Sequence, residues 1–174
     1  MRHNLKILAM ESPSGVVEWH TPHTHPDITH EYTGAVNASI FLSGPMTAWR
    51  REVVGKLKPA PATRVVVYDP TNRDWDATWK FGNPAYMKQI EWERAAMRES
   101  TYVLVYLPKD TPAPTTHMEM ALAAAFGRDV VVVVEDGAPN GDYVRARFAR
   151  MCTFVASIQD AIACLNGAGE CEPL

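Results

Sequence analysis

The sequence predicts an α/β fold built on a doubly wound, mostly parallel sheet of about five core strands. Two apolar runs, at residues 101–107 and 129–135, do not alternate with polar residues, as is typical of strands buried on both faces of a parallel sheet. A helical segment at residues 115–126 lies between them, and parallel neighbours need such a crossover. Shorter runs at residues 38–42 and 64–68 continue the alternation of strands and helices. This pattern is Rossmann-like or flavodoxin-like.

The remaining elements follow from apolar spacing and turn residues. A helix is expected from Thr47 to the prolines near residue 59, a short strand at residues 153–156, and a last helix at residues 157–165. The longest helix is expected at residues 85–100. Its predicted core face carries Tyr86, Ile90 and Met97, and an adjacent face carries Gln89, Trp92, Glu93 and Ala96. That mixed face is either the wall of a polar cleft or a solvated side of the helix.

Composition favours a small-molecule ligand. The 174 residues suffice for one domain, with 47% apolar and 21% charged residues and a net charge of −3. No run of Lys or Arg exceeds two residues, so neither a nucleic-acid polymer nor an anionic membrane is an expected partner. The valine run is far shorter than a membrane span, and the apolar run at residues 7–10 is too short for a signal peptide. We therefore expect a cytoplasmic protein.

Residues 1–37 form an N-terminal extension of different character. Strand-like pieces at residues 5–10 and 15–19 flank a turn and predict a hairpin on the edge of the main sheet. A loop rich in histidine follows and could be a metal cluster, but no known zinc spacing matches, so a polar surface loop is the favoured interpretation. Its histidines are His20, His23, His25 and His30. Cys152, Cys164 and Cys171 fit no disulfide framework, and we expect reduced thiols.

Unusual segments follow each core strand, at the edge where parallel α/β sheets bind ligands. They bring Asp74, Asp76, Glu119 and, as a further candidate, Glu93 toward one crevice, among tryptophans. Crowded carboxylates tend to separate in pKa, so that one is ionised and one protonated. That division suits glycosidic cleavage, in which one carboxylate attacks C1 and another group protonates the departing atom. Neither a dinucleotide-binding nor a P-loop glycine motif is present, and no cofactor is expected.

Each candidate carboxylate also has a purely structural interpretation. Thr116 and Glu119 have the spacing of a capping box, which from local sequence alone is the favoured role of Glu119. The two roles are compatible, because the positive end of the helix dipole would keep Glu119 ionised, as a nucleophile requires. Asp74 and Asp76 could equally be capping residues of a surface turn.

Four motifs, in this order, resemble the nucleoside 2-deoxyribosyltransferase-like family. They are Phe41-Leu-Ser-Gly-Pro45, Asp69-Pro70 with Arg73-Asp-Trp-Asp76 and Trp79, Gln89-Ile-Glu-Trp-Glu93, and Met118-Glu-Met-Ala121. The resemblance is strongest to the branch with Arg-Asp-Trp-Asp and Gln-x-x-Trp-Glu motifs and covers residues 39–134. It implies that residues 38–174 form one domain of this family.

The resemblance implies that Glu119 is a nucleophile that attacks C1′ of a deoxynucleoside, and that Asp74 and Asp76 contact the base and help to protonate it. A neighbouring subunit often completes the site in this family, so a homo-oligomer is implied. The substrate-binding residues expected by this resemblance and by position are Phe41, Ser43, Gly44, Pro45, Met46, Trp75, Trp79, Gln89, Trp92, Glu93, Thr116 and Met118.

Two departures from the family pattern are visible. Met120-Ala121 replaces the usual Leu-Gly after the nucleophile, and Phe148 stands where the branch carries asparagine. The expected activity is transfer of a 2-deoxyribosyl group between nucleobases, as in nucleoside salvage, through a covalent glutamyl intermediate. The alternatives are an N-glycoside hydrolase of nucleosides or nucleoside monophosphates, and a non-catalytic nucleotide-sensing module.

Overall fold

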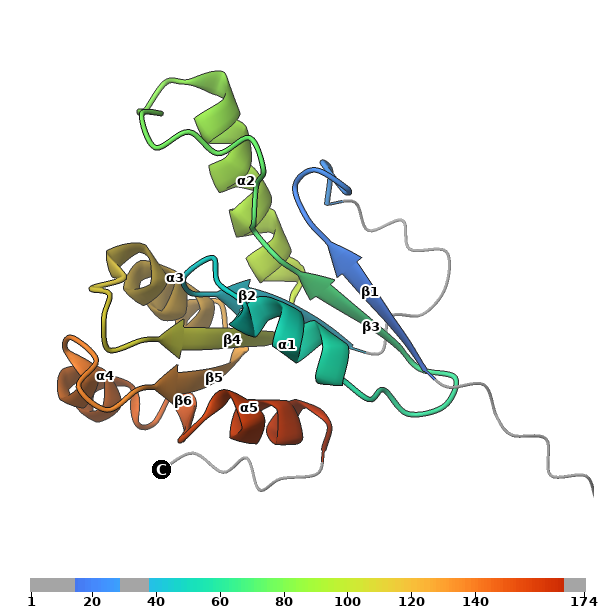
Figure 1. Cartoon of the computed structure of the whole chain (residues 1–174), viewed down its shortest axis with the longest axis vertical. Helices are drawn as coiled ribbons and strands as arrows, with labels where there is room; N and C mark the ends of the chain where they lie inside the picture. The colour runs from blue at the N-terminus through green and yellow to red at the C-terminus, as the bar shows by residue number, and fades with distance from the viewer. Residues whose placement is uncertain (1–14, 29–37, 168–174) are drawn as a thin grey trace, which may run out of the picture.

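The described part of the chain forms a six-stranded, fully parallel sheet in the order β1-β3-β2-β4-β5-β6 (Figure 1). The computed structural model describes residues 15–28 and 38–167. The strands are β1 (Val16–His20), β2 (Ala38–Ser43), β3 (Arg64–Tyr68), β4 (Tyr102–Leu107), β5 (Asp129–Val134) and β6 (Cys152–Val155). The prediction of a doubly wound parallel α/β fold is confirmed.

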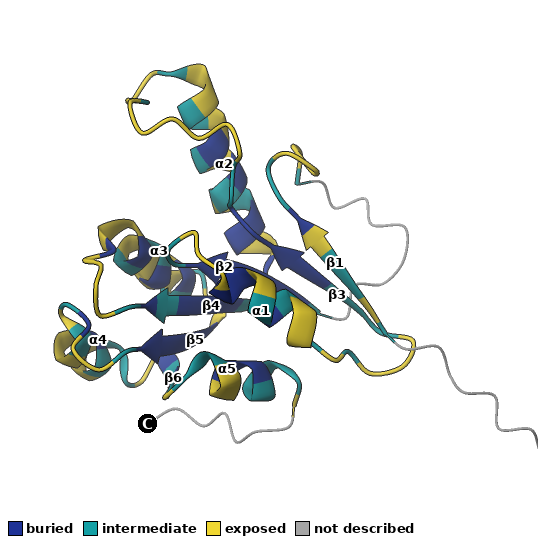
Figure 2. Cartoon of the chain, in the orientation of Figure 1, coloured by how far each residue is buried: buried dark blue, intermediate teal, exposed yellow. Residues whose placement is uncertain are grey.

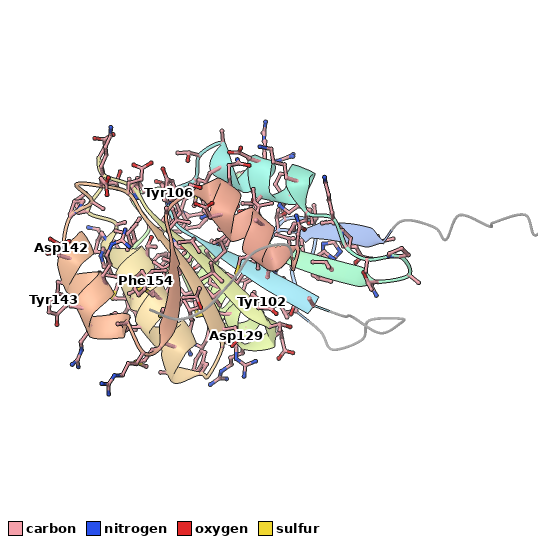
Figure 3. All side chains as sticks on the ribbon, turned by 90° about the horizontal axis from the view of Figure 1, so that it is seen from below. Tyr102, Tyr106, Asp129, Asp142, Tyr143 and Phe154 are labelled. Atoms are coloured by element: carbon pink, nitrogen blue, oxygen red, sulfur yellow. The ribbon has the colours of Figure 1, made fainter. Side chains whose placement is uncertain are left out.

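Helices cover both faces of the sheet. They are α1 (Trp49–Lys56), α2 (Pro84–Glu99), α3 (Pro114–Ala125), α4 (Gly141–Phe148) and α5 (Ile158–Leu165). Helices α1 and α5 pack on one face, and α2, α3 and α4 pack on the other, as the view from below shows for all but α2 (Figure 3). Because α1 and α3 leave the neighbouring strands β2 and β4 toward opposite faces, the carboxyl ends of these two strands form the crevice where such folds bind ligands.

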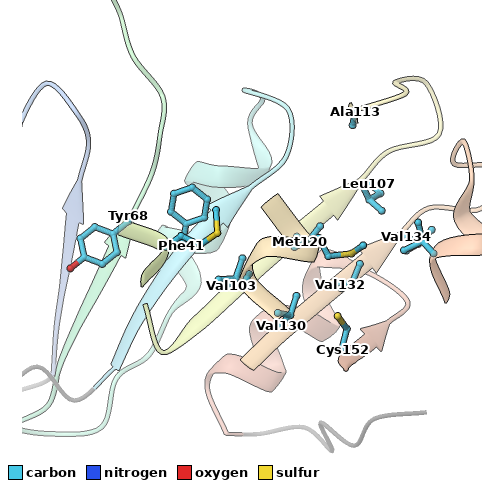
Figure 4. Close-up of a cluster of buried hydrophobic side chains, with 14 of the residues drawn as sticks. Phe41, Tyr68, Val103, Leu107, Ala113, Met120, Val130, Val132, Val134 and Cys152 are labelled. Carbon is cyan, nitrogen blue, oxygen red and sulfur yellow. The ribbon is translucent and has the colours of Figure 1, made fainter. Parts of the chain in front are cut away.

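The valine-rich strands are buried on both faces, as their lack of alternation predicts. Val103, Val130 and Val132 face Met120 of α3 in one cluster (Figure 4). Leu104, Val131 and Val133 face Trp49 and Ile162 in the other cluster. Phe41 is fully buried in the first cluster, so its ring belongs to the core and is not open to a ligand, contrary to its expected role in substrate binding.

The N-terminal strand joins the main sheet at its edge. β1 pairs in parallel with β3, from Val16 opposite Arg64 to His20 opposite Tyr68. It is therefore the edge strand expected at residues 15–19, next to the five core strands. The other arm of the expected hairpin, residues 5–10, lies outside the described residues. The loop after β1 also contacts α2, because Trp92 Nε1 donates a hydrogen bond of 2.7 Å to the carbonyl oxygen of His25.

The predicted core face of α2 is wrong in part. The buried residues are Gln89, Trp92, Ala96 and Met97, whereas Tyr86 and Ile90 are only half-buried. The mixed face therefore packs inward and the helix is rotated from the orientation expected. The N-terminal half of α2 extends away from the sheet and carries the exposed loop after β3 at its far end (Figure 2).

Two further expectations concern cysteines and membranes. Cys152 is a free, buried thiol, but Cys164 is disulfide-bonded, so the expectation of reduced thiols is wrong for that residue. Among the described residues, no helix is both long and apolar enough to span a bilayer.

Candidate active site

The turn between β2 and α1 is held in a conformation that only glycine fits. Gly44 has φ = 150°, and a Cβ at this position would lie 2.8 Å from the carbonyl oxygen of Tyr106. Arg50 Nη2 donates to the carbonyl oxygen of Gly44 at 2.5 Å, and Nη1 donates to that of Leu42 at 3.1 Å. Its Nε donates to the carbonyl oxygen of Pro45 at 3.3 Å. One guanidinium therefore fixes the whole turn.

Arg50 is paired with Asp69 at the end of β3. The distance from Arg50 Nη1 to Asp69 Oδ1 is 2.6 Å, and the two side chains are 4% and 2% exposed. The same carboxylate accepts hydrogen bonds from the backbone and hydroxyl of Thr71, and from Trp19 Nε1. A buried charge pair is tolerated when its remaining hydrogen-bonding capacity is used, and here it ties the ends of β1, β2 and β3 together.

Glu119 reaches this edge from α3. Ser43 Oγ, at the end of β2, donates a hydrogen bond of 2.5 Å to Glu119 Oε2. This contact joins two residues that are 76 positions apart in the sequence. It brings together the serine and the glutamate that the sequence motifs selected separately.

The capping-box interpretation of Glu119 is wrong. Helix α3 begins at Pro114, after Ala113 in the left-handed conformation, so Thr116 and Glu119 both lie inside the helix. Ala113 makes no side-chain cap. Glu119 therefore lies beyond the first turn, where the helix dipole is weak. Burial raises the pKa of Glu119, while the Ser43 hydroxyl and the charge of Arg50 act in the opposite direction.

Glu93 of α2 provides a second carboxyl near the first. Gln89 Nε2 donates to Glu93 Oε1 at 2.8 Å and to the carbonyl oxygen of Pro70 at 2.9 Å. Asn72 donates to Gln89 Oε1 at 3.0 Å, so the buried amide is fully engaged. Of the two interpretations of the mixed face of α2, the structure contradicts the solvated side, because Gln89 is buried and Glu93 is half-buried.

Burial, together with the negative charge of Glu119, raises the pKa of Glu93 to about 7, while the hydrogen bond from Gln89 and the charge of Arg50 act in the opposite direction. The pKa of both carboxyls is raised by burial, and the two groups act on each other as charges. Crowded carboxyls of this kind tend to separate in pKa. The partner of Glu119 in this arrangement is Glu93 and not an aspartate of the loop after β3.

Asp74 and Asp76 are exposed in the loop after β3, and this loop runs out to the far end of α2, away from α3 (Figure 1). Asp76 Oδ1 accepts hydrogen bonds from the backbone and hydroxyl of Thr78, which lower the pKa of its carboxyl. Trp75 packs against Trp79 and Tyr86, with ring centroids 5.4 and 5.9 Å apart. The aromatic side chains of the loop pack together, and its two aspartates are exposed to solvent.

The other expected site residues fall into two groups. Thr116 and Trp92 are buried and serve packing, while Met46 and Met118 are exposed.

Arg50 and Asp69 were not selected as site residues, although they make the contacts that hold the turn. The sequence contained features that could have identified both residues. An aspartate follows directly after β3, at the ligand-binding edge, and an arginine lies next to the apolar stripe of α1.

The histidine loop provides no metal cluster in the part of the chain that the structure describes. His20 and His25 stack with ring centroids 3.5 Å apart, and His20 Nε2 lies 3.1 Å from Glu18 Oε2. Burial is the main cause that lowers the pKa of His20. His30 lies outside the described residues.

Residues 37–137 match the family model described as nucleoside 2-deoxyribosyltransferase like. The chain belongs to this family. The match spans more than half of the sequence and includes Ser43, Glu93 and Glu119. Residues 15–28, with β1 and the histidine loop, lie outside the match. A comparison with curated proteins found no significant match.

Solved structures with similar folds share 13–14% sequence identity with this member of the family. A conserved protein from Enterococcus faecalis V583 has a TM-score of 0.51, covering 76% of this chain and 99% of its own. The 2-deoxyribosyltransferase of Bacillus psychrosaccharolyticus has a TM-score of 0.48, covering 72% and 90%. The CMP N-glycosidase BcmB of Clostridium botulinum has a TM-score of 0.42, covering 74% and 98%.

Asp69→Asn should destabilise the protein strongly. The substitution leaves the buried Arg50 guanidinium without its counter-charge, and breaking such a pair costs about 3–5 kcal/mol in the free energy of unfolding. Urea unfolding measures this loss. The matched control is Glu52→Gln, which removes the exposed ion pair with Lys56 and should have a far smaller effect. Equal losses in the two variants would contradict the role assigned to the Arg50–Asp69 pair.

The contribution of Glu93 to stability should decline as the pH rises from 4.5 to about 7. In this range the unfolded chain has lost the Glu93 proton while the folded chain keeps it, because the folded pKa is raised from 4.5 to about 7. Urea unfolding at several pH values should show that the free energy of unfolding of the wild type, relative to that of Glu93→Gln, falls across this range. A constant difference would refute the raised pKa. Glu91→Gln, an exposed neighbour on α2, is the control.

Proposed function

We propose that this protein cleaves the N-glycosidic bond of a deoxynucleoside or its monophosphate and transfers the 2-deoxyribosyl group between nucleobases. The observation that carries the proposal is the Ser43–Glu119 hydrogen bond at the carboxyl ends of the strands, near Glu93, whose pKa is raised to about 7. Membership of the nucleoside 2-deoxyribosyltransferase-like family supports this class of reaction.

In the proposed reaction, an oxygen of the Glu119 carboxylate attacks C1′ of the sugar. A glycosyl ester forms as the bond from C1′ to the base nitrogen breaks, and Glu93 gives its proton to the departing base. A second base then attacks C1′, the ester bond breaks, and the proton lost by this base returns to Glu93. Ser43 holds one oxygen of Glu119, which leaves the other oxygen for the attack.

The loop after β3 has a separate role in this proposal. Asp74 and Asp76 would contact the base, as the resemblance implies, but they lie far from Glu119 of their own chain. We therefore assign them to the site of a neighbouring subunit in a homo-oligomer. The exposed side chains of Trp75 and Phe81 beside them, 40% and 89% accessible, support a contact between subunits at this loop.

The test is incubation of the purified protein with a panel of nucleosides and nucleotides, with and without free adenine, followed by chromatography. The expected result is exchange of the base, and Glu119→Gln should reduce the rate by about three orders of magnitude or more, because it removes the nucleophile. Glu91→Gln, which is exposed on α2, should leave the rate unchanged.

Other outcomes separate the alternatives. Release of free sugar at a rate indifferent to added adenine would make the protein a hydrolase, in which water replaces the second base. Binding of a nucleotide without any turnover would identify a sensing module. Full activity in Glu119→Gln would overturn the assigned chemistry altogether.

A further inference from the structure

Two side-chain amides connect the loop after β3 to the carboxyl group of Glu93. The backbone N–H of Asp74 donates a hydrogen bond of 2.9 Å to Asn72 Oδ1. Asn72 Nδ2 donates to Gln89 Oε1 at 3.0 Å, and Gln89 Nε2 donates to Glu93 Oε1 at 2.8 Å. Gln89 is only 2% exposed. The two amides therefore form a continuous chain of hydrogen bonds that ends, inside the protein, on a carboxyl oxygen.

The backbone determines the orientation of both amides. The N–H of Asp74 can only donate, so Asn72 turns its oxygen toward it and its nitrogen toward Gln89. The carbonyl oxygen of Pro70 can only accept, and Gln89 Nε2 donates to it at 2.9 Å. A flipped Gln89 amide would place two acceptors together at Pro70 and two donors together at Asn72. Glu93 therefore faces an N–H group of Gln89.

This contact makes the two oxygens of Glu93 different. Oε1 accepts the N–H of Gln89, which makes Oε1 the poorer site for a proton. In the neutral acid the proton is therefore on Oε2. A hydrogen bond to a charged acceptor is about twice as strong as one between neutral groups. The same N–H thus stabilises the carboxylate that remains after the proton has left.

Three groups on different helices influence the proton of Glu93, in addition to burial. The negative charge of Glu119 on α3 favours the protonated form, and the positive charge of Arg50 on α1 favours the ionised form. The hydrogen bond from Gln89 on α2 favours the ionised form more strongly than the charge of Arg50 does. Because Gln89 is neutral, its effect can be removed without changing the net charge around Glu93.

We propose that Gln89, held by Asn72 and Pro70, is a positioning residue that makes Oε2 of Glu93 the oxygen that gives its proton to the departing base. The use of this proton rests on the proposed function, whereas the state of Glu93 can be measured without turnover. Because the chain of hydrogen bonds starts at the backbone of Asp74, a displacement of the loop after β3 changes the hydrogen bonding of Glu93.

Carbon-13 NMR of protein labelled at the glutamate carboxyl carbons tests the proposal, with the Glu93 signal assigned by its absence in Glu93→Gln. Gln89→Met removes the N–H group and keeps a side chain of similar length. The titration midpoint of Glu93 should move upward by about one pH unit, the loss expected for one hydrogen bond to a charged group. The same limb of the pH profile of base exchange should move with it. A merely structural defect would hydrate Glu93 and lower its midpoint toward 4.5.

Asn72→Ala keeps Gln89 but removes the group that orients it, and should give a smaller upward shift. The matched control is Gln159→Met on α5, which removes an exposed amide that is hydrogen-bonded to Glu52 and Lys56 and should not move the midpoint. Thermal melting verifies that each variant is folded.

The proposal is overturned if Gln89→Met leaves the midpoint unchanged or lowers it, or if Asn72→Ala behaves like Gln159→Met. Absence of base exchange in the wild type would overturn the proposed function alone, because the midpoint is measured without substrate.

Discussion

The buried ion pair between Arg50 and Asp69 is the interaction on which the functional edge of this protein depends. A charge pair this deep contributes little net stability by itself, because both groups lose their hydration. The main effect of the pair is to hold the neighbouring backbone and side chains in place. Three carbonyl oxygens of the β2–α1 turn accept hydrogen bonds from Arg50, and Thr71 and Trp19 bind Asp69. The ends of β1, β2 and β3 are therefore fixed by one pair.

This constraint also determines the electrostatics of the two carboxyls. The turn places Ser43 where its hydroxyl meets Glu119, and the positive charge of Arg50 favours ionised forms of both Glu119 and Glu93. Burial opposes ionisation of both. The result is two coupled carboxyls with raised pKa values, carried by α3 and α2 on the same face of the sheet. The proposed reaction needs one of them as a nucleophile and the other as a proton donor.

The fold could be predicted from sequence because strand periodicity reveals it. The positions after the strands also selected Ser43 and Glu119 as site residues, but the hydrogen bond between them was not predicted. The start of α3 could not be predicted, because Pro114 begins the helix earlier than the capping pattern around Thr116 suggested. The inward face of α2 was misassigned because Gln89 is polar, yet it is buried with each of its donors and acceptors engaged. Such compensation depends on residues that are distant in sequence, here Pro70 and Asn72.

The position of the loop after β3 was also predicted wrongly, because its own side chains determine where it packs. Asp74 and Asp76 follow a strand whose carboxyl end lies at the site, and this position predicted that they would converge with Glu119. The loop instead extends to the far end of α2, where Trp75, Trp79 and Tyr86 pack together. Position after a strand predicts where a loop begins, whereas the packing of its apolar side chains determines where it ends. Sequence spacing contains the first kind of information only.

The central claim is that Glu119 forms a covalent bond to the sugar, and trapping that bond tests it most directly. A nucleoside with fluorine at C2′ slows both steps through its electron-withdrawing effect on C1′, so a glycosyl ester can accumulate. Intact-protein mass spectrometry after incubation should show one added fluorosugar, and peptide mapping should place it on Glu119. An adduct on any other residue, or turnover of the natural substrate by Glu119→Gln at the wild-type rate, would contradict this account.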